Sequence, residues 1–304
     1  MKRHYIASII FCLGILSCNV QAQVNIFACE PEWAALAEEI GGKHVKVFAA
    51  THAKQDPHHI RARPSFIAKI RRADLVICSG AGLEAGWLPV LMQKASAKVQ
   101  PGTDGYLMAS DLVTVLEKPT YVDRSMGDVH PEGNPHVHLD PHNISIVSQE
   151  LLQRLSRIDS ANSEYYDKRF QKFNARWEKA IVQWEKDAAP LDQKTIIVHH
   201  KNFIYLITWL NLRQVGSLEP RPGIPPTTGH LEDLLIKIKE GDPVDLIFRA
   251  SYESADASEW LSKQTGIPAI MMPYTVGGDS ESKDLFSLFD RSISLLIQAS
   301  SGND

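Results

Sequence analysis

Two series of short apolar runs, each run followed by a helix-like segment, constrain the fold of this chain most strongly. The expected strands are Val24–Ala28, Val45–Ala49 and 73–77 in the first series, and Thr195–Val198, 245–248 and Ala269–Met272 in the second. The expected helices are 33–40, Pro64–Ile70 and 87–94, then 203–210, 231–240, 258–265 and a last helix from about Leu285. Apolar strands that alternate with helices are typical of parallel sheets with helical crossovers. The sequence therefore predicts an α/β fold.

One long, mostly helical stretch, residues 143–187, separates the two series. Its large apolar residues recur every three or four positions and so share one helix face: Phe170, Phe173, Trp177, Ile181 and Trp184. We interpret this face as core packing rather than as a cofactor site. The polar pair Asp159-Ser160 leaves open a break in the helix. We expect the stretch to connect a first unit at 23–142 to a second unit at 188–304.

The first 22 residues have the pattern of a targeting segment. Lys2 and Arg3 precede an apolar stretch at 6–16, which is too short to span a bilayer, and small residues up to Ala22 suit cleavage there. We therefore expect a signal peptide at 1–22 and an exported protein of a bacterial periplasm. A second interpretation stays open, because the residues before Cys18 resemble a lipobox and would leave a lipid-anchored Cys18.

Charge excludes one class of partner. Loss of Lys2 and Arg3 leaves 30 basic residues against 36 acidic ones, so the net charge goes from −4 to −6. Nucleic-acid binding needs a basic face that neutralises phosphates, and this composition argues against it.

Two cysteines, Cys29 and Cys78, remain after cleavage at Ala22. Each follows a strand-like run, so the two would lie near one sheet edge if those strands are neighbours. In an oxidising compartment we favour a disulfide between them. The alternative is a pair of buried thiols that pack as small apolar residues, and thiolate metal ligation is less expected because the two are not closely spaced.

Histidine is concentrated in three short stretches that hold seven of the 12 histidines: His58 and His59, then His136, His138 and His142, then His199 and His200. Imidazole is the commonest protein ligand for zinc and also suits copper, nickel and iron. Two of the stretches have a proline directly before the first histidine, which stiffens the chain there. Three such clusters in one exported chain favour a metal site assembled from distant points.

Within each stretch one histidine is the expected ligand. His58 follows Pro57, His136 follows Pro135, and His200 comes just after a predicted strand. His59, His138 and His199 are assigned auxiliary roles, and His138 could also be a ligand, because it shares a face with His136 in an extended segment. His142 could support the ligands or lie in a solvated loop.

A fourth ligand is expected to be a carboxylate near the start of the last helix. We prefer Asp284, which directly precedes that helix, and keep Asp279, which follows a Gly-Gly turn, as the alternative. The competing interpretation of Asp284 is a helix N-cap.

These residues belong to a wider pattern. The chain resembles the zinc and manganese solute-binding proteins of bacterial ABC importers, the cluster A-I type, and within them the zinc-uptake subgroup. The resemblance is carried by Asp56-Pro57-His58 with Arg63-Pro64-Ser65, Ala73-Asp74-Leu75-Val76 with Gly82-Leu83-Glu84, Asn134-Pro135-His136 with Leu139-Asp140-Pro141, His200 with Tyr205, Pro222-Gly223-Ile224-Pro225-Pro226, and Val276-Gly277-Gly278. It covers nearly the whole mature chain in the right order.

The resemblance implies two β/α lobes with parallel sheets, one long linking helix, and a metal ion in the cleft between the lobes. It implies His58, His136, His200 and a C-terminal aspartate as ligands, and a monomeric protein that delivers its metal to an inner-membrane ABC permease without catalysing a reaction. The chain departs from the family at His138, where an aromatic is common, and at 128–132, which stand where zinc members often have a long histidine-rich loop.

Ligand chemistry favours zinc over manganese. Three imidazoles and one carboxylate suit Zn²⁺ in a tetrahedral site, whereas manganese sites of the family commonly have two carboxylates. The alternatives are an exported zinc-dependent hydrolase, a manganese-specific binding protein, and a lipoprotein adhesin anchored at Cys18. No His-Glu-x-x-His motif supports a hydrolase.

Overall fold

Two four-stranded parallel sheets form the frame of the protein in a computed structural model that describes residues 23–123 and 126–301. The first sheet has the order β2-β1-β3-β4, and the second has the order β6-β5-β7-β8. The strands of the first sheet are β1 (Val24–Ala28), β2 (Val45–Ala49), β3 (Leu75–Cys78) and β4 (Tyr106–Met108). Those of the second are β5 (Thr195–Val198), β6 (Arg213–Ser217), β7 (Leu246–Ala250) and β8 (Ala269–Met272). The predicted signal peptide and Cys18 lie outside the described residues.

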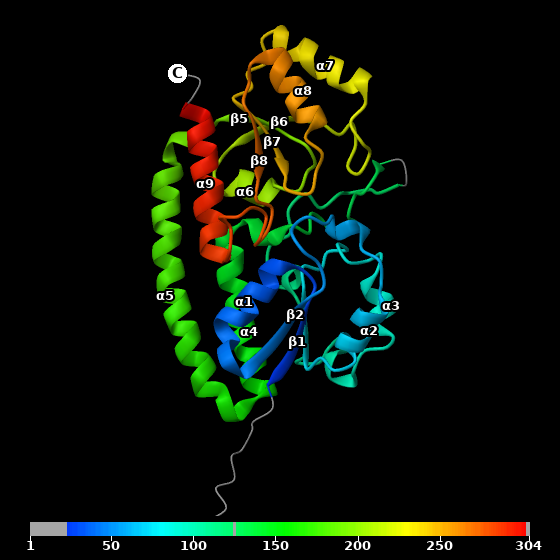
Figure 1. Cartoon of the computed structure of the whole chain (residues 1–304), viewed down its shortest axis with the longest axis vertical. Helices are drawn as coiled ribbons and strands as arrows, with labels where there is room; N and C mark the ends of the chain where they lie inside the picture. Colours follow the sequence, from blue (N-terminus) through cyan, green and yellow to red (C-terminus); the bar gives the residue numbers. More distant parts are fainter. Residues whose placement is uncertain (1–22, 124–125, 302–304) are drawn as a thin grey trace, which may run out of the picture.

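Each sheet with its helices makes one lobe, and the two lobes lie one above the other in Figure 1. The helices of the N-terminal lobe are α1 (Pro31–Gly41), α2 (Pro64–Ile70) and α3 (Leu88–Met92). Those of the C-terminal lobe are α6 (Ile204–Trp209), α7 (Thr228–Lys239), α8 (Asp256–Thr265) and α9 (Leu285–Ser301). The prediction of two α/β lobes with parallel sheets is thus confirmed.

The apolar runs predicted all four central strands and the edge strands β2 and β8. β1 lies between β2 and β3, and β5 lies between β6 and β7, so these strands are covered on both sides and are nearly all buried. Strands buried on both faces of a parallel sheet read as continuous apolar runs. β4 and β6 were not predicted. β4 has only three residues, and β6 is an edge strand with exposed Arg213 and Val215, so neither has that apolar signature.

The connecting stretch consists of two packed helices, α4 (Pro141–Ile158) and α5 (Ser163–Ala188). The break lies at Asp159, whose backbone is not helical (φ −132°, ψ 68°) and whose carboxylate accepts hydrogen bonds from Asn162 and Tyr166 at 2.7 Å each. α5, 26 residues long, runs along one side of both lobes and packs against α1 below and α9 above (Figure 1). Its aromatic stripe is buried core, as predicted.

Cys29 and Cys78 form a disulfide. They follow or end the neighbouring strands β1 and β3, and their Cα atoms are 4.8 Å apart. Among the helices of the described residues, none is both long and apolar enough to cross a membrane.

Candidate metal centre

Three imidazoles from distant segments meet between the two lobes. His58, His136 and His200 each offer a ring nitrogen, and these atoms all lie within 4.8 Å of one another. The ring centroid of His58 is 5.2 Å from that of His136 and 5.6 Å from that of His200. The structure therefore brings together the three histidines that the sequence singled out, one from each stretch.

The local chain holds each of these histidines in place. His58 lies in a short 3₁₀ turn (Pro57–His59) after β2, where the Asp56 side chain accepts a hydrogen bond from the His58 backbone N–H at 3.0 Å. His136 is held in the same way by the side chain of Asn134, at 3.1 Å. His200 comes two residues after β5, at the carboxyl edge of the second sheet, which is where parallel sheets place their ligand sites.

The outer nitrogen, Nδ1, of each ring has a partner of its own. His58 Nδ1 lies 2.7 Å from Asp56 Oδ1, His200 Nδ1 lies 2.6 Å from Glu219 Oε2, and His136 Nδ1 lies 2.6 Å from the Tyr274 hydroxyl. A carboxylate only accepts hydrogen bonds, so the Nδ1 atoms of His58 and His200 carry the proton and donate it. This leaves the Nε2 lone pairs available to a metal. Such partners orient metal-binding imidazoles and raise their basicity.

A fourth imidazole, His130, lies beside His58 and was not predicted, although its nitrogens do not lie within 4.8 Å of those of all three histidines. Its Nε2 lies 3.2 Å from His58 Nε2, and the two ring centroids are 5.2 Å apart. His130 belongs to the segment 128–132, whose place in the resemblance is that of the histidine-rich loop of zinc members. Its position in this segment could have identified His130 as a candidate ligand. The histidines singled out from the sequence are clustered, and His130 stands alone.

The auxiliary histidines have other surroundings. His138 is buried, with Nδ1 3.1 Å from Glu32 Oε1 and Nε2 3.0 Å from the Tyr274 carbonyl oxygen. His199 lines a different cavity, beside Pro226 and Trp260. His59 and His142 have mostly exposed side chains, and His142 pairs with Glu185 at 3.0 Å. None of these four belongs to the group of converging nitrogen atoms.

Neither of the two aspartates expected as a fourth ligand belongs to this group either. Asp284 is exposed and caps α9, because its Oδ1 accepts a hydrogen bond from the Ser287 backbone N–H at 2.8 Å. Asp279 is held by Arg291 at 2.8 Å and by the Ser282 backbone N–H at 2.8 Å. Asp284 Oδ1 and both oxygens of Asp279 are engaged in helix and turn contacts near the start of α9, away from the converging imidazole nitrogens.

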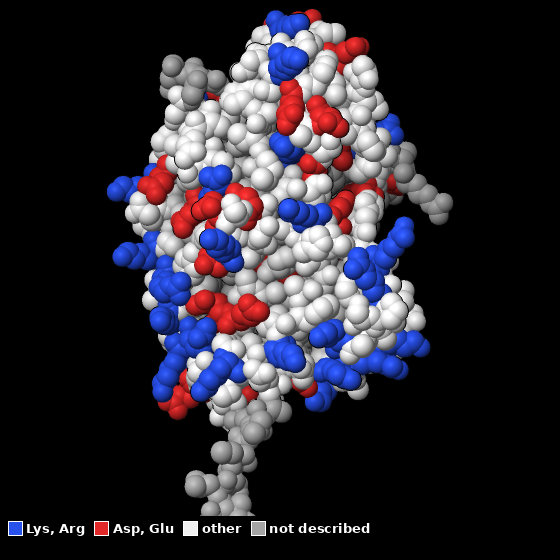
Figure 2. All heavy atoms as spheres, viewed as in Figure 1, with Lys and Arg blue, Asp and Glu red and all other residues white. Residues whose placement is uncertain are grey.

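Carboxylates surround the imidazoles. A cavity of about 180 Å³ beside His58 and His200 is lined by Asp56, Asp128, Glu219 and Glu253, and no lysine or arginine among the described residues lines it. On the face drawn in Figure 2, lysine and arginine gather around the lower, N-terminal lobe. Burial raises the pKa of Glu253 to about 7. The cavity therefore favours a cation.

The imidazoles differ in how readily they accept a proton. Burial and the neighbouring imidazoles hold the pKa of His136 well below its usual value, and burial lowers that of His130 to about 4. Burial also favours the neutral form of His200, but the hydrogen bond and charge of Glu219 outweigh it and raise the pKa of His200. In their neutral form these imidazoles, beside an acid-lined cavity, can bind a divalent cation of borderline softness.

Two α/β lobes joined by a long helix, with an imidazole cluster between them, define a metal-binding substrate-binding protein of an ABC importer. More specifically, the chain belongs to the ZnuA family, described as periplasmic zinc-uptake complex component A, whose sequence model matches residues 26–299. Members of this family are the binding subunits of metal transporters and not enzymes.

Relatives and solved structures agree with this class. The chain is 24% identical over 272 residues to the metal ABC transporter substrate-binding lipoprotein SloC of Streptococcus mutans, covering 86% of both chains. It is 24% identical over 259 residues to the manganese ABC transporter substrate-binding lipoprotein PsaA of Streptococcus pneumoniae, covering 83% of this chain and 80% of that one. A crystal structure of ZnuA has the same fold, with a TM-score of 0.74, 20% identity, and coverage of 93% and 100%.

Proposed function

We propose that this protein captures Zn²⁺ in the cleft between its lobes and delivers it to a membrane permease. The observation that carries the proposal is the convergence of three imidazole nitrogens within 4.8 Å of one another. The Nδ1 atom of each of these rings contacts a carboxylate or a tyrosine hydroxyl, which fixes the orientation of the ring. His58, His136 and His200 are the proposed ligands. The ion is the transported substrate, so the protein needs to bind it tightly and release it to a partner.

Zinc is proposed over manganese because of the donor atoms. Imidazole nitrogens suit Zn²⁺, whereas Mn²⁺ prefers carboxylate and other oxygen ligands. We expect metal-free protein to bind Zn²⁺ at least about 100-fold more tightly than Mn²⁺ in a competition titration, following the general affinity order for nitrogen ligands. Equal affinity for the two ions would contradict the zinc assignment while leaving metal binding intact.

We further propose that the protein acts as a monomer in the periplasm, with residues 1–22 as its signal peptide. A lipid anchor at Cys18, as in relatives named lipoproteins, is the alternative. The mass of the mature N-terminal peptide distinguishes the two, because lipidation adds acyl chains to a peptide that begins at Cys18.

We propose His130 as the fourth donor in place of an aspartate. Its Nε2 lies 3.2 Å from that of His58, and burial keeps its ring neutral. We expect His130→Ala to weaken zinc binding about 10- to 100-fold, which is the typical cost of disturbing one partner of a metal site. Isothermal titration of the metal-free variant measures this.

Asp284→Ala and Asp279→Ala are the matched controls. Both should leave zinc affinity within about twofold, and Asp284→Ala should lower the free energy of unfolding by about 1 kcal/mol through loss of the helix cap. A loss of affinity in Asp284→Ala, with none in His130→Ala, would restore the aspartate as ligand.

Zinc binding is also expected to weaken as the pH falls below the pKa of His200. A metal binds the neutral imidazole, so a proton competes with it, and His200 is the ligand whose pKa is raised. His136 and His130 have lowered pKa values and stay neutral in this range. The affinity should fall about tenfold per pH unit below the His200 pKa.

Zinc titrations between about pH 8 and pH 5 test this dependence. In Glu219→Gln the hydrogen bond of His200 remains but the charge is gone, so the fall in affinity should begin at lower pH. An unchanged onset would show that Glu219 does not control the proton of His200.

A further inference from the structure

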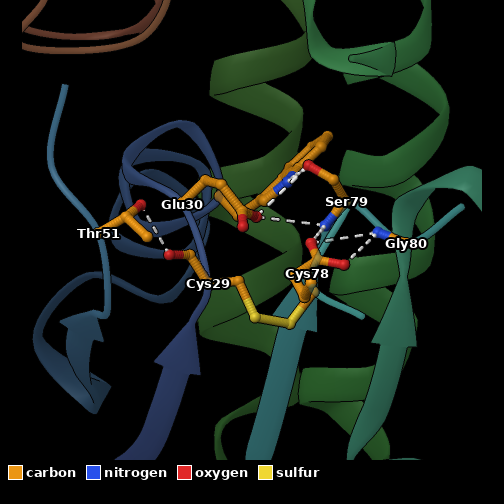
Figure 3. Close-up of a disulfide and its surroundings, with 8 residues drawn as sticks. Cys29, Glu30, Thr51, Cys78, Ser79 and Gly80 are labelled. Atoms are coloured by element: carbon orange, nitrogen blue, oxygen red, sulfur yellow. Dashed lines mark hydrogen bonds between the residues drawn. A yellow bond between two sulfur atoms is a disulfide. The ribbon is translucent and has the colours of Figure 1, made fainter. Parts of the chain in front are cut away.

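A second group of potential metal ligands lies inside the N-terminal lobe, away from the imidazoles. The buried side chains of Glu30 and Glu84 flank the disulfide between Cys29 and Cys78, with 1% and 3% of their surface exposed. Figure 3 shows the Glu30 side chain reaching toward Ser79 above the sulfur atoms. Two buried carboxyl groups this close together need a shared proton or a cation.

The protein supplies hydrogen bonds to only some of the carboxyl oxygens in this group. Glu84 accepts hydrogen bonds from the backbone N–H groups of Ser79 at 2.8 Å and Gly80 at 3.1 Å. Glu30 Oε2 accepts one from Ser79 at 3.3 Å, but Glu30 Oε1 is buried without a hydrogen-bond partner. Burial and the charge of Glu84 raise the pKa of Glu30. The two carboxyl groups can share a proton in a hydrogen bond between them, and a bound cation would take the place of that proton.

The sulfur atoms lie close to the Glu84 carboxyl group. Cys29 Sγ, Cys78 Sγ and an oxygen of Glu84 all lie within 4.8 Å of one another. Two thiolates with carboxylate oxygens make a donor set that suits Zn²⁺ and similar soft or borderline cations. Thiolate is the form that binds metal, so the disulfide itself leaves this set incomplete.

One of these residues, Glu84, lies at the wall of a cavity that a cation can enter. Glu84 lines a cavity of about 580 Å³ at the side of the N-terminal lobe, together with Asp111 and Glu132. Within residues 23–123 and 126–301, no lysine or arginine lines this cavity. Its acidic walls favour the entry of a cation over that of an anion.

We propose that Cys29, Cys78, Glu84 and Glu30 form a second Zn²⁺ site when the two cysteines are reduced. The site exists in only one redox state. A dithiol reductant supplies two electrons and two protons, which convert the disulfide into two thiols while the reductant becomes a disulfide. Zn²⁺ then displaces the two thiol protons and binds the thiolates together with the Glu84 and Glu30 oxygens.

The two cysteines can therefore form either a disulfide or part of a zinc site, but not both at once. The disulfide is fully buried, with both cysteines at 0% exposure, so in the folded protein it exchanges only slowly with a dithiol. A chain that folds before oxidation would hold zinc at this position, and a chain that is oxidised first would not. The zinc content of the protein would therefore record the redox conditions of its folding.

The test compares zinc stoichiometry in two forms of the same purified chain. One form keeps the disulfide, and the other is reduced with a dithiol, freed of reductant without air and checked for two thiols. Equilibrium dialysis should give one zinc for the oxidised form and two for the reduced form. With Co²⁺ as the probe, a thiolate charge-transfer band should arise only in the reduced form.

Variants separate this site from the cleft. Cys29→Ser with Cys78→Ser should bind one zinc under both conditions, and His136→Ala should lose only the cleft zinc. Glu84→Gln should weaken the second zinc about tenfold or more, whereas Glu185→Gln, on exposed helix surface, should not. One zinc in the reduced form, or a Co²⁺ spectrum without the thiolate band, would overturn the proposal and leave the cleft assignment untouched.

Reduction could also unfold the lobe, which circular dichroism would reveal. Cys78→Ser then provides the test, because it cannot form the disulfide and keeps one thiolate beside both carboxyl groups. A Co²⁺–thiolate band in this variant supports the proposal, and its absence from a folded variant overturns it.

Discussion

Replacing His136 or His200 with alanine is expected to weaken zinc binding by about 100-fold or more. A four-ligand zinc site contributes roughly 10–16 kcal/mol, so one ligand accounts for about 3 kcal/mol. Both side chains are buried at the meeting point of the lobes, and His58 cannot move to replace either of them without breaking its own Nδ1 contact with Asp56. Isothermal titration of metal-free protein gives the change directly.

His142→Ala is the matched control for this prediction. His142 lies in the same histidine-rich stretch as His136, but its side chain is 53% exposed and pairs with Glu185. Its removal should change zinc affinity by less than about twofold, since exposed ion pairs contribute little. If His142→Ala and His136→Ala were equally weak binders, the stretch would act as a diffuse histidine-rich surface and the defined site would be wrong.

The largest expected effect on stability comes from Trp177→Ala in the connecting helix α5. Trp177 is fully buried, stacks on Phe173, and has Phe286 of α9 at a ring distance of 4.9 Å. Its indole N–H donates to the Pro141 carbonyl oxygen at the start of α4, at 2.9 Å. Loss of this side chain leaves a cavity where α4, α5 and α9 meet and should cost about 3–5 kcal/mol.

Urea unfolding followed by circular dichroism measures that cost. Val182→Ala, on the same helix but 67% exposed, should stay within about 0.5 kcal/mol of the parent chain. A Trp177→Ala variant as stable as Val182→Ala would mean that the lobes do not depend on the aromatic face of α5.

The strands that the sequence predicted are those that it encodes by local composition. Val24–Ala28, Val45–Ala49, Thr195–Val198 and Ala269–Met272 have the predicted bounds, because apolar and β-branched residues cluster there between polar turns. The edge strands β2 and β8 were predicted, but the edge strand β6 was missed for the opposite reason. Arg213–Ser217 forms a strand because β5 offers it backbone partners, and its own side chains are mostly polar or exposed.

In the metal centre, too, some features follow from the local sequence and others only from the tertiary structure. The three histidines could be selected because each stands at a locally defined position, after a proline or after a strand. The choice of an aspartate as fourth donor rested on the family resemblance and on position near the last helix, and the structure places both aspartates in contacts at the start of α9. His130 comes close to His58 across 72 residues of chain, a distance over which no local pattern relates two side chains.

The sequence by itself determined the alternation of strands and helices, the connecting stretch with its aromatic face, and the three histidine positions, because all of these follow from periodicity and neighbouring residues. The tertiary structure alone decided which nitrogens are free to bind metal. Asp56 holds its own neighbour, but Glu219 and Tyr274 reach His200 and His136 across 19 and 138 residues. These contacts depend on how two separate sheets and their loops pack together, and chain topology sets that packing.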